Sequence, residues 1–431
     1  MRLVGKNVVI YGAGISGLAA YELVREKGAK AIVYDDDAKA DHATNSTGVF
    51  DGADIIVLSP GVDANRDFLL DARLDNIPVV SELSLASRIC LAEQIAITGT
   101  NGKTTTTMLI DHILKRAGLH SHAVGNIGIP FCSIADKLDA TEIAVIEASS
   151  FQLENSPDFA PDVAVLLNIA PDHLSRHKTM QNYVNAKAMI FRNQSESDVV
   201  VYNADDEIIR GLIPQAVAKK VPFSTRDVEL DGAYLSSGFV CFKGKPVVAL
   251  EDVDFKGEEL QNVLAAVAVC MERGVSAFCV ASAITDFAKP QYRRQFVAKI
   301  DGVDVYNDSK STNISACLCA LECCDDCVLI LGGQKGEEDF DYLFENMPDG
   351  AKGFVACGEN ADVIFDCAKA HGYDVSVREN LSDALACALQ KAHETEAKNV
   401  LFSPASKSFD RYKNFEERGR VFDAIALKRK R

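Results

Sequence analysis

The chain has 431 residues, 48% of them hydrophobic and 25% charged, which is the composition of an ordinary globular protein. This length is too great for a single hydrophobic core, so we expect two or three domains. The formal net charge of −17 argues against a nucleic-acid-binding protein, which would need a basic stripe.

The sequence shows none of the usual signals for export or membrane insertion. No apolar run approaches the ~20 residues of a membrane-spanning helix, and the first residues lack the apolar core of a signal peptide. The thirteen cysteines are scattered and odd in number, which favours reduced thiols over a disulfide framework. We therefore expect a cytoplasmic protein without a membrane span or a nucleic-acid partner.

A strand, a glycine run and a helix open the chain, in the order typical of a dinucleotide-binding fold. They are residues 7–11, the run Gly12-Ala-Gly14-Ile-Ser-Gly17, and residues 18–27. A second strand, 31–34, ends in Asp35-Asp36-Asp37, where that fingerprint places an acid that binds ribose. Strands 55–58 and 79–80 and the loop Ser59-Pro-Gly61 complete a parallel α/β unit. By itself this unit would also fit an NAD domain.

A phosphate loop begins the second part of the chain. The strand 95–97 enters Thr98-Gly99-Thr100-Asn101-Gly102-Lys103-Thr104, and a helix-compatible stretch over 108–117 follows. Backbone N–H groups at such a helix start bind phosphate, Lys103 adds a positive charge, and the Thr104 hydroxyl can hold Mg²⁺. The longer phosphate-loop pattern has a glycine where this chain has Ile97, so the match is to the short form.

Two further residues of this part lie at expected strand ends. Glu147 follows the strand 143–146, and His173 follows the strand 163–167 after a short loop. Since the carboxyl ends of parallel strands line the site of an open α/β sheet, both side chains are expected to face the phosphate loop.

A third α/β pattern starts near Pro290, with strands expected over residues 303–306, 328–331, 353–356 and 399–402. The whole chain is therefore predicted to be an α/β protein of three domains. These are a Rossmann-like parallel sheet (1–91), a central P-loop ATPase-like domain (92–289) and a second Rossmann-like domain (290–431).

Together these motifs closely resemble the Mur ligase family, the ATP-dependent amino-acid ligases of peptidoglycan synthesis. The resemblance extends over nearly the whole chain. It rests on the two glycine loops, Gly125-Asn-Ile-Gly128, Glu147-x-Ser-Ser-Phe-Gln-Leu-Glu154, Asp172-His173 and Asn307-Asp-Ser-Lys-x-Thr-Asn313. The block Ser403-Pro-Ala-Ser-Lys-Ser408 with Lys413-Asn-Phe415 looks like the D-glutamate-adding members, and the Asp-Asn-Pro-Arg signature of the diaminopimelate-adding members is missing.

The resemblance implies an amide-forming reaction through an acyl phosphate, with ATP, two Mg²⁺ ions, D-glutamate and UDP-N-acetylmuramoyl-L-alanine. It assigns the first domain to UDP rather than NAD, and we expect a monomer whose partners are small molecules. The implied residues for the UDP substrate are Gly14, Ile15, Ser16, Asp35, Asp36, Ser59, Gly61, Asn126 and His173. Those for ATP are Gly99, Thr100, Asn101, Gly102, Lys103, Thr104, Thr105, Asn262, Arg293, Asp308 and Lys310. Those for D-glutamate are Thr312, Lys335, Ser408 and Phe415.

The catalytic residues implied by the resemblance are Lys103, Glu147, His173 and Lys187, and the metal ligands are Thr104, Glu147, His173 and Lys187 as a carbamate. Lys187 stands among apolar neighbours in the stretch 183–191, where burial would lower its pKa and leave an amine that captures CO₂. The chain departs from the family at Glu258 and Glu259, where a His-Asn pair is usual, so the contacts to adenine stay open.

Three other functions fit parts of the sequence. An NAD-dependent oxidoreductase would explain the first glycine run and Asp35, but it leaves the phosphate loop without a role. A folate polyglutamate ligase shares the central and C-terminal chemistry, but it would not carry a UDP-binding domain. A regulator that binds nucleotide without catalysis is disfavoured because the expected catalytic positions carry competent residues.

Overall fold

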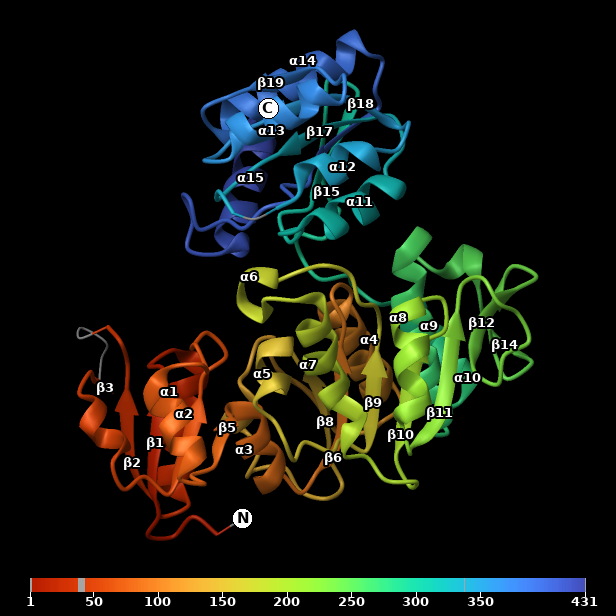
Figure 1. Cartoon of the computed structure of the whole chain (residues 1–431). Coiled ribbons are helices and arrows are strands. Elements are labelled where there is room, and N and C mark those ends of the chain that lie inside the picture. Colours follow the sequence, from red (N-terminus) through yellow and green to blue (C-terminus); the bar gives the residue numbers. More distant parts are fainter. Residues whose placement is uncertain (1, 38–42, 337, 431) are drawn as a thin grey trace. The chain divides into compact units, whose positions relative to one another are not determined.

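The computed structural model describes residues 2–37, 43–336 and 338–430. They form two compact units, Met1–Phe255 with Leu260–Phe287, and Lys256–Glu259 with Ala288–Arg431. The first unit contains two β-sheets and the second unit contains one (Figure 1). The predicted α/β class is confirmed.

The first sheet has five strands, all parallel, in the order β3-β2-β1-β4-β5. Its elements are β1 (Asn7–Tyr11), α1 (Ile15–Glu26), β2 (Lys30–Tyr34), β3 (Ala43–Thr44), the short 3₁₀ helix η1 (Thr47–Phe50), β4 (Ile55–Leu58), α2 (Asp67–Leu74), β5 (Val79–Ser81) and α3 (Glu82–Ile89). Val8 and Ile10 of β1 pack under α1 and α3, whereas Val9 and Tyr11 pack under α2. Both faces of this sheet are therefore covered, which explains the continuous apolar runs of its central strands.

The second sheet has nine strands in the order β14-β13-β12-β11-β10-β9-β6-β8-β7, and only the pairs β12–β13 and β13–β14 are antiparallel. Its strands are β6 (Glu93–Thr98), β7 (Ser121–Gly125), β8 (Ile143–Glu147), β9 (Val163–Leu166), β10 (Val199–Asn203), β11 (Lys219–Ser224), β12 (Ala233–Ser236), β13 (Phe239–Phe242) and β14 (Lys245–Ala249). Its helices are α4 (Lys103–Arg116), η2 (Phe131–Ser133), α5 (Ser150–Glu154), α6 (Leu174–His177), α7 (Met180–Arg192), α8 (Glu207–Leu212), η3 (Ile213–Gln215), η4 (Leu250–Asp252), α9 (Leu260–Glu272) and α10 (Ala277–Thr285).

In this sheet too, alternate side chains of the central strands point to opposite faces and pack into two different apolar cores. Ile95 and Ile97 of β6 pack under α4, α9 and α10, whereas Ala96 faces the core that α7 covers. This arrangement places the carboxyl ends of β6, β8 and β9 side by side, since these three strands are parallel neighbours.

The third sheet lies in the second unit and has six strands in the order β15-β16-β20-β17-β18-β19, of which only β15 is antiparallel to its neighbour. The elements of this unit are η5 (Gly257–Glu259), β15 (Gln295–Ile300), β16 (Val303–Asn307), α11 (Ile314–Glu322), β17 (Cys327–Leu331), α12 (Phe340–Glu345), β18 (Ala351–Ala356), α13 (Ala361–Ala370), β19 (Val375–Val377), α14 (Leu381–Glu394), β20 (Asn399–Phe402) and α15 (Phe415–Arg429). Helices α14 and α15 cover one face, and α11, α12 and α13 cover the other.

A buried carboxyl group joins the first sheet to the second. Glu82, the first residue of α3, is 1% exposed, and its Oε1 accepts the backbone N–H of Cys132 at 2.6 Å. Its Oε2 is buried without a hydrogen-bond partner, and burial raises the pKa of this carboxyl above its ordinary value of 4.5. The neighbouring Ser81 Oγ lies 2.6 Å from Ser156 Oγ, so polar contacts reinforce the apolar packing here.

The raised pKa of Glu82 predicts a stability that depends on pH. A carboxyl whose folded pKa exceeds its unfolded pKa contributes stability below the unfolded value, and this is lost as pH rises through the folded value. We therefore expect the wild type to lose stability relative to Glu82→Gln between pH 4.5 and pH 8.5, by roughly 1–3 kcal/mol. Denaturant unfolding at both pH values measures this difference, with the exposed Glu251→Gln as control. A constant difference between wild type and Glu82→Gln would contradict it.

No helix among residues 2–37, 43–336 and 338–430 combines the length and apolarity needed to cross a bilayer.

Candidate active site

The phosphate loop joins β6 to α4 as predicted, and the helix begins at Lys103 itself. Gly102 has a φ of +84°, and a Cβ atom there would lie 2.1 Å from Asn262 Oδ1. Only glycine meets both conditions without strain. Asn262, on α9, also accepts a hydrogen bond from Thr106 Oγ1 at 3.2 Å, so this ATP-binding candidate lies directly against the loop.

The loop folds around the side chain of Lys103. Its Nζ donates to the carbonyl oxygens of Gly99 and Thr100 at 2.8 and 2.9 Å. Lys103 is also the first residue of α4, a helix of fourteen residues. The lysine charge therefore lies beside the backbone N–H groups of the helix start. Such a place favours the phosphates of a nucleotide.

Oxygen donors gather beside the loop at the end of β8. Glu147 is 2% exposed, its Oε2 accepts from Thr104 Oγ1 at 2.8 Å, and its Oε1 accepts from Asn126 Nδ2 at 2.9 Å. Ser149 and Gln152 form a capping box at the start of α5, which ends the strand and holds Glu147 at its tip. A carboxylate, a hydroxyl and an amide oxygen are ligands that Mg²⁺ prefers, so these residues fit a magnesium ion.

Two residues that the sequence did not predict hold the loop from the side of β9. Asn168 Oδ1 accepts the backbone N–H of Asn101 at 2.8 Å, and the Tyr183 hydroxyl lies 3.0 Å from Thr100 Oγ1. Asn168 follows directly after the buried run 163–167, so its place at a strand end was the available signal. No signal in the sequence indicated Tyr183, because this residue contacts the loop from 83 positions away.

Lys187 is buried beneath the same loop. It is 1% exposed, and its Nζ donates to Gly99 O at 2.7 Å and lies 4.6 Å from the centre of the Tyr183 ring. Burial, followed by the nearby charge of Lys103, holds the pKa of this amine well below its usual value. Lys187 therefore has the environment that the sequence predicted.

His173 lies at the start of α6 with a φ of +54°, and its side chain is partly exposed. Its Nδ1 lies 3.6 Å from Asp172 Oδ1, and its ring is 5.0 Å from that of Phe151. A chain of ring contacts runs from Phe151 to His177 and from His177 to Tyr183. The Tyr183 hydroxyl in turn contacts Thr100 of the phosphate loop. His177 is buried, and its pKa is lowered to about 4, chiefly by that burial.

Several of the residues predicted for the UDP substrate lie where β1, β2 and β4 end. Gly12 has a φ of +105°, and a Cβ atom there would lie 2.7 Å from Ser59, whose hydroxyl donates to Gly12 O at 3.1 Å. Asp35 Oδ2 accepts the backbone N–H of Ala13 at 2.7 Å and so shapes the glycine loop. Three further candidates, Gly14, Ile15 and Ser16, form the start of α1, with Gly14 and Ile15 exposed.

Most candidates of the third sheet lie in loops that follow its strands, whereas Arg293 precedes β15 and Phe415 begins α15. Asp308, after β16, is buried and accepts from Ser311 Oγ at 2.5 Å and Ser403 Oγ at 2.7 Å, and burial raises its pKa to about 6. These bonds join the loops after β16 and β20. Lys310 Nζ lies 3.9 Å from the centre of the Phe415 ring, which brings an ATP candidate and a D-glutamate candidate together.

The other candidates of this unit differ in exposure. Ser408, after β20, is 2% exposed, Thr312 is partly buried just before α11, and Lys335 is exposed after β17. Arg293 Nε is buried without a hydrogen-bond partner. Of the two glutamates that replace the family's usual His-Asn pair, Glu259 forms ion pairs with Lys289 at 3.2 Å and with Arg294 at 3.0 Å.

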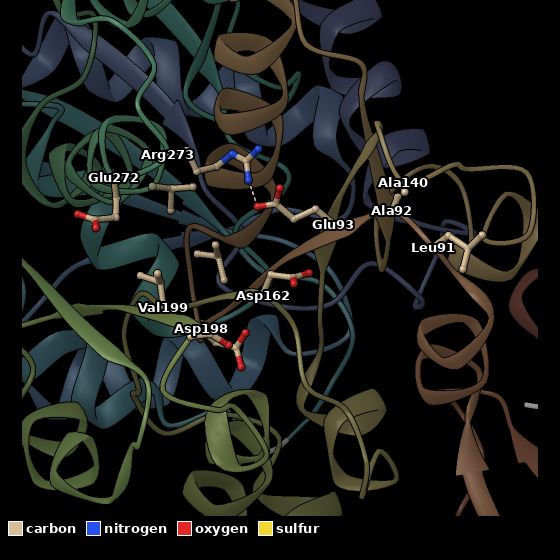
Figure 2. A pocket seen from close by; sticks show the side chains of 12 residues that line it. Leu91, Ala92, Glu93, Ala140, Asp162, Asp198, Val199, Glu272 and Arg273 are labelled. Carbon is tan, nitrogen blue, oxygen red and sulfur yellow. Dashed lines mark ion pairs between the residues drawn. The ribbon is translucent and has the colours of Figure 1, made fainter.

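A cavity of about 530 Å³ lies at the opposite edge of the second sheet, where β6, β9 and β10 begin. Figure 2 shows its lining, with the ion pair between Glu93 and Arg273. Since Glu93 begins β6 and the phosphate loop follows its end, this cavity is separate from the candidate site. None of the predicted site residues lines it.

The chain belongs to the Mur ligase family. Residues 97–270 match the description of the Mur ligase middle domain. A protein of Caldanaerobacter subterraneus is 36% identical, with 99% of both chains covered, and one of Acidobacterium capsulatum is 37% identical, with 99% of this chain and 97% of that one covered. Both relatives are named UDP-N-acetylmuramoylalanine–D-glutamate ligase.

Solved structures of the family share the fold. The UDP-N-acetylmuramate–alanine ligase of Thermotoga maritima has a TM-score of 0.63 at 19% identity, covering 98% of this chain and 100% of that one. The MurF ligase of the same organism, in complex with ADP, has a TM-score of 0.61 at 17% identity, covering 99% and 96%.

Proposed function

We propose that this Mur ligase joins D-glutamate to UDP-N-acetylmuramoyl-L-alanine with ATP, in the cytoplasmic synthesis of peptidoglycan precursors. Two observations support the proposal. The relatives that carry this name match the chain from end to end at 35 to 37% identity. The phosphate loop, Glu147 and Lys187 also form one connected group, with Glu147 bonded to Thr104 and Lys187 bonded to Gly99.

The reaction would proceed in two steps. A carboxylate oxygen of the UDP substrate attacks the γ-phosphorus of ATP, so that ADP leaves and an acyl phosphate forms. The amine of D-glutamate then attacks the acyl carbon, and phosphate leaves. Both steps bring anions together, so positioning and charge neutralisation supply most of the catalysis.

The residues of the phosphate loop have separate roles in this proposal. Lys103 and the start of α4 bind the phosphates of ATP, while Thr104 and Glu147 would hold a Mg²⁺ ion and Asn126 orients Glu147. Such an ion would neutralise phosphate charge. His173 and a carbamate on Lys187 would hold a second ion, since a buried amine of lowered pKa is able to react with CO₂.

We propose that the three sheets correspond to the domains 1–91, 92–289 and 290–431, which bind UDP, ATP and D-glutamate respectively. The ATP site would also take Arg293, Asp308 and Lys310, with Asp308 ordering the loops around it. The D-glutamate site would consist of Thr312, Lys335, Ser408 and Phe415. We further propose that the chain acts as a monomer.

Release of phosphate tests this function. We expect release only when ATP, Mg²⁺, UDP-N-acetylmuramoyl-L-alanine and D-glutamate are all present, and no effect of NAD. Omitting each component in turn gives the control. Release that continues without the UDP substrate, or a reaction driven by NAD, would contradict the proposal.

The D-glutamate site gives a prediction of its own. Loss of a hydrogen bond to a carboxylate weakens binding by about ten- to a hundred-fold. We therefore expect Ser408→Ala and Thr312→Ala to raise the KM for D-glutamate by that factor and to leave the KM for ATP nearly unchanged. Steady-state kinetics with each substrate varied in turn measures both constants. If the two variants instead lose ATP affinity and keep their KM for D-glutamate, the site lies elsewhere.

A further inference from the structure

An ion pair crosses the carboxyl edge of the first sheet. Arg66 ends the loop that follows β4, and its Nη2 donates to Asp36 Oδ2 at 2.7 Å, just beyond the end of β2. In the sheet order β2-β1-β4, the strand β1 lies between these two points. The arginine side chain therefore reaches across the end of β1, from which the glycine loop begins.

At this edge the order in which the chain adds strands to the sheet reverses. The chain runs from β1 outward to β2 and β3, and then returns to β4 on the other side of β1. The helix after β1 covers one face and the helix after β4 covers the other. In open parallel sheets, the crevice at such a point binds the ligand.

Asp36 is held in place by other groups. Its carboxylate accepts from the hydroxyls of Tyr11 at 2.6 Å and Tyr34 at 3.1 Å. Both tyrosines are almost fully buried, and their rings pack with those of Phe50 and Phe68. The Tyr11 hydrogen bond is the largest cause of the lowered pKa of Asp36, so the carboxylate is a fixed negative charge.

The guanidinium of Arg66 has more N–H donors than its bond to Asp36 uses. A guanidinium carries five N–H groups in a rigid fork that suits phosphate oxygens, and the side chain is 46% exposed. Three consecutive aspartates, Asp35 to Asp37, stand beside the glycine loop in a chain of net charge −17. A nucleotide diphosphate that binds there needs a cation, because the first turn of α1 supplies backbone N–H groups and the Ser16 hydroxyl but no positive charge.

We infer that Arg66 binds the diphosphate of the uridine nucleotide substrate, and that Asp36 is the positioning residue that holds Arg66 across the crevice. The inference rests on the proposed function, which makes a UDP-linked sugar the substrate. It also changes the role predicted for Asp36 from direct contact with the nucleotide to support of the residue that makes contact.

Calorimetric titration of the full chain with UDP and with uridine tests the inference. Arg66→Gln is expected to weaken UDP binding by about ten- to a hundred-fold, and to leave uridine binding unchanged, since uridine has no phosphate. The loss should shrink at high salt, because a partly exposed charge is screened. Lys6→Gln is the matched control, since Lys6 forms an exposed ion pair with Asp54 at 2.7 Å, just before β1 at the opposite edge of the same sheet.

Asp36→Asn separates positioning from simple repulsion. If Asp36 positions Arg66, the variant weakens UDP binding, and the double variant is no weaker than Arg66→Gln alone. Stronger UDP binding by Asp36→Asn would overturn the positioning role. Unchanged UDP binding by Arg66→Gln, or an equal loss for uridine, would overturn the diphosphate contact. If the wild type binds neither UDP nor uridine, the proposed function fails together with the inference. If the wild type binds UDP and Arg66→Gln binds it equally well, only the inference fails.

Discussion

Lys187→Ala is expected to lower kcat by about 100- to 1,000-fold, and short carboxylic acids such as formate or acetate are expected to restore part of it. The lysine is buried, its Nζ donates to Gly99 O, and its pKa is strongly lowered. These conditions favour a carbamate, and a small carboxylate that enters the space left by the side chain would replace that anion. Phosphate release with and without added acid measures the effect.

The control for this variant is Lys115→Ala, which removes an exposed lysine paired with Asp111 on the same helix as the phosphate loop lysine. It should keep full activity and show no response to formate. Circular dichroism and thermal melting establish that Lys187→Ala is folded. A folded Lys187→Ala with wild-type turnover would contradict the role of Lys187, and loss of activity without rescue would contradict the carbamate.

Glu147→Gln is expected to lower kcat by about 100-fold or more and to raise the Mg²⁺ concentration needed for half-maximal rate. Glutamine has the size of glutamate and keeps an oxygen for Asn126 Nδ2, but it removes the charge that would bind the metal ion. Rates measured across a magnesium titration test both parts.

Glu154→Gln provides the comparison, because Glu154 lies at the end of α5 in the same segment and faces Arg176 at 4.0 Å. We expect it to change neither the rate nor the magnesium dependence by more than about three-fold. An unchanged magnesium dependence of Glu147→Gln would show that the carboxylate is not a metal ligand.

The strands and the glycine loops could be predicted because their signals are local. The expected strand 7–11 coincides with β1, and the strand 399–402 coincides with β20. The helix after the phosphate loop was expected from residue 108, but α4 starts at Lys103, and Thr104 to Thr107 are buried in its first turns rather than exposed in a loop. The strands from β10 to β14, which widen the second sheet, were not predicted.

The contacts that complete the candidate site join residues far apart in the chain, and no periodicity reveals them. Asn168 and Tyr183 support the phosphate loop from 67 and 83 positions away. Asp36 was expected to contact the nucleotide because it follows a strand, and the structure places it just beyond the end of β2. Its bonds to Tyr11, Tyr34 and Arg66 depend on the order of three strands, so the sequence alone could not assign them.

The central claim is that this chain adds D-glutamate to a UDP-linked acceptor. Its most direct test is the identity of the amino acid found in the nucleotide product when D-glutamate, L-glutamate, L-lysine and diaminopimelate are offered together at equal concentration with ATP, Mg²⁺ and UDP-N-acetylmuramoyl-L-alanine. Mass spectrometry and chiral analysis of the hydrolysed product give the answer. We expect D-glutamate alone to be incorporated, and a product that contains L-lysine or diaminopimelate in comparable amount would contradict the claim.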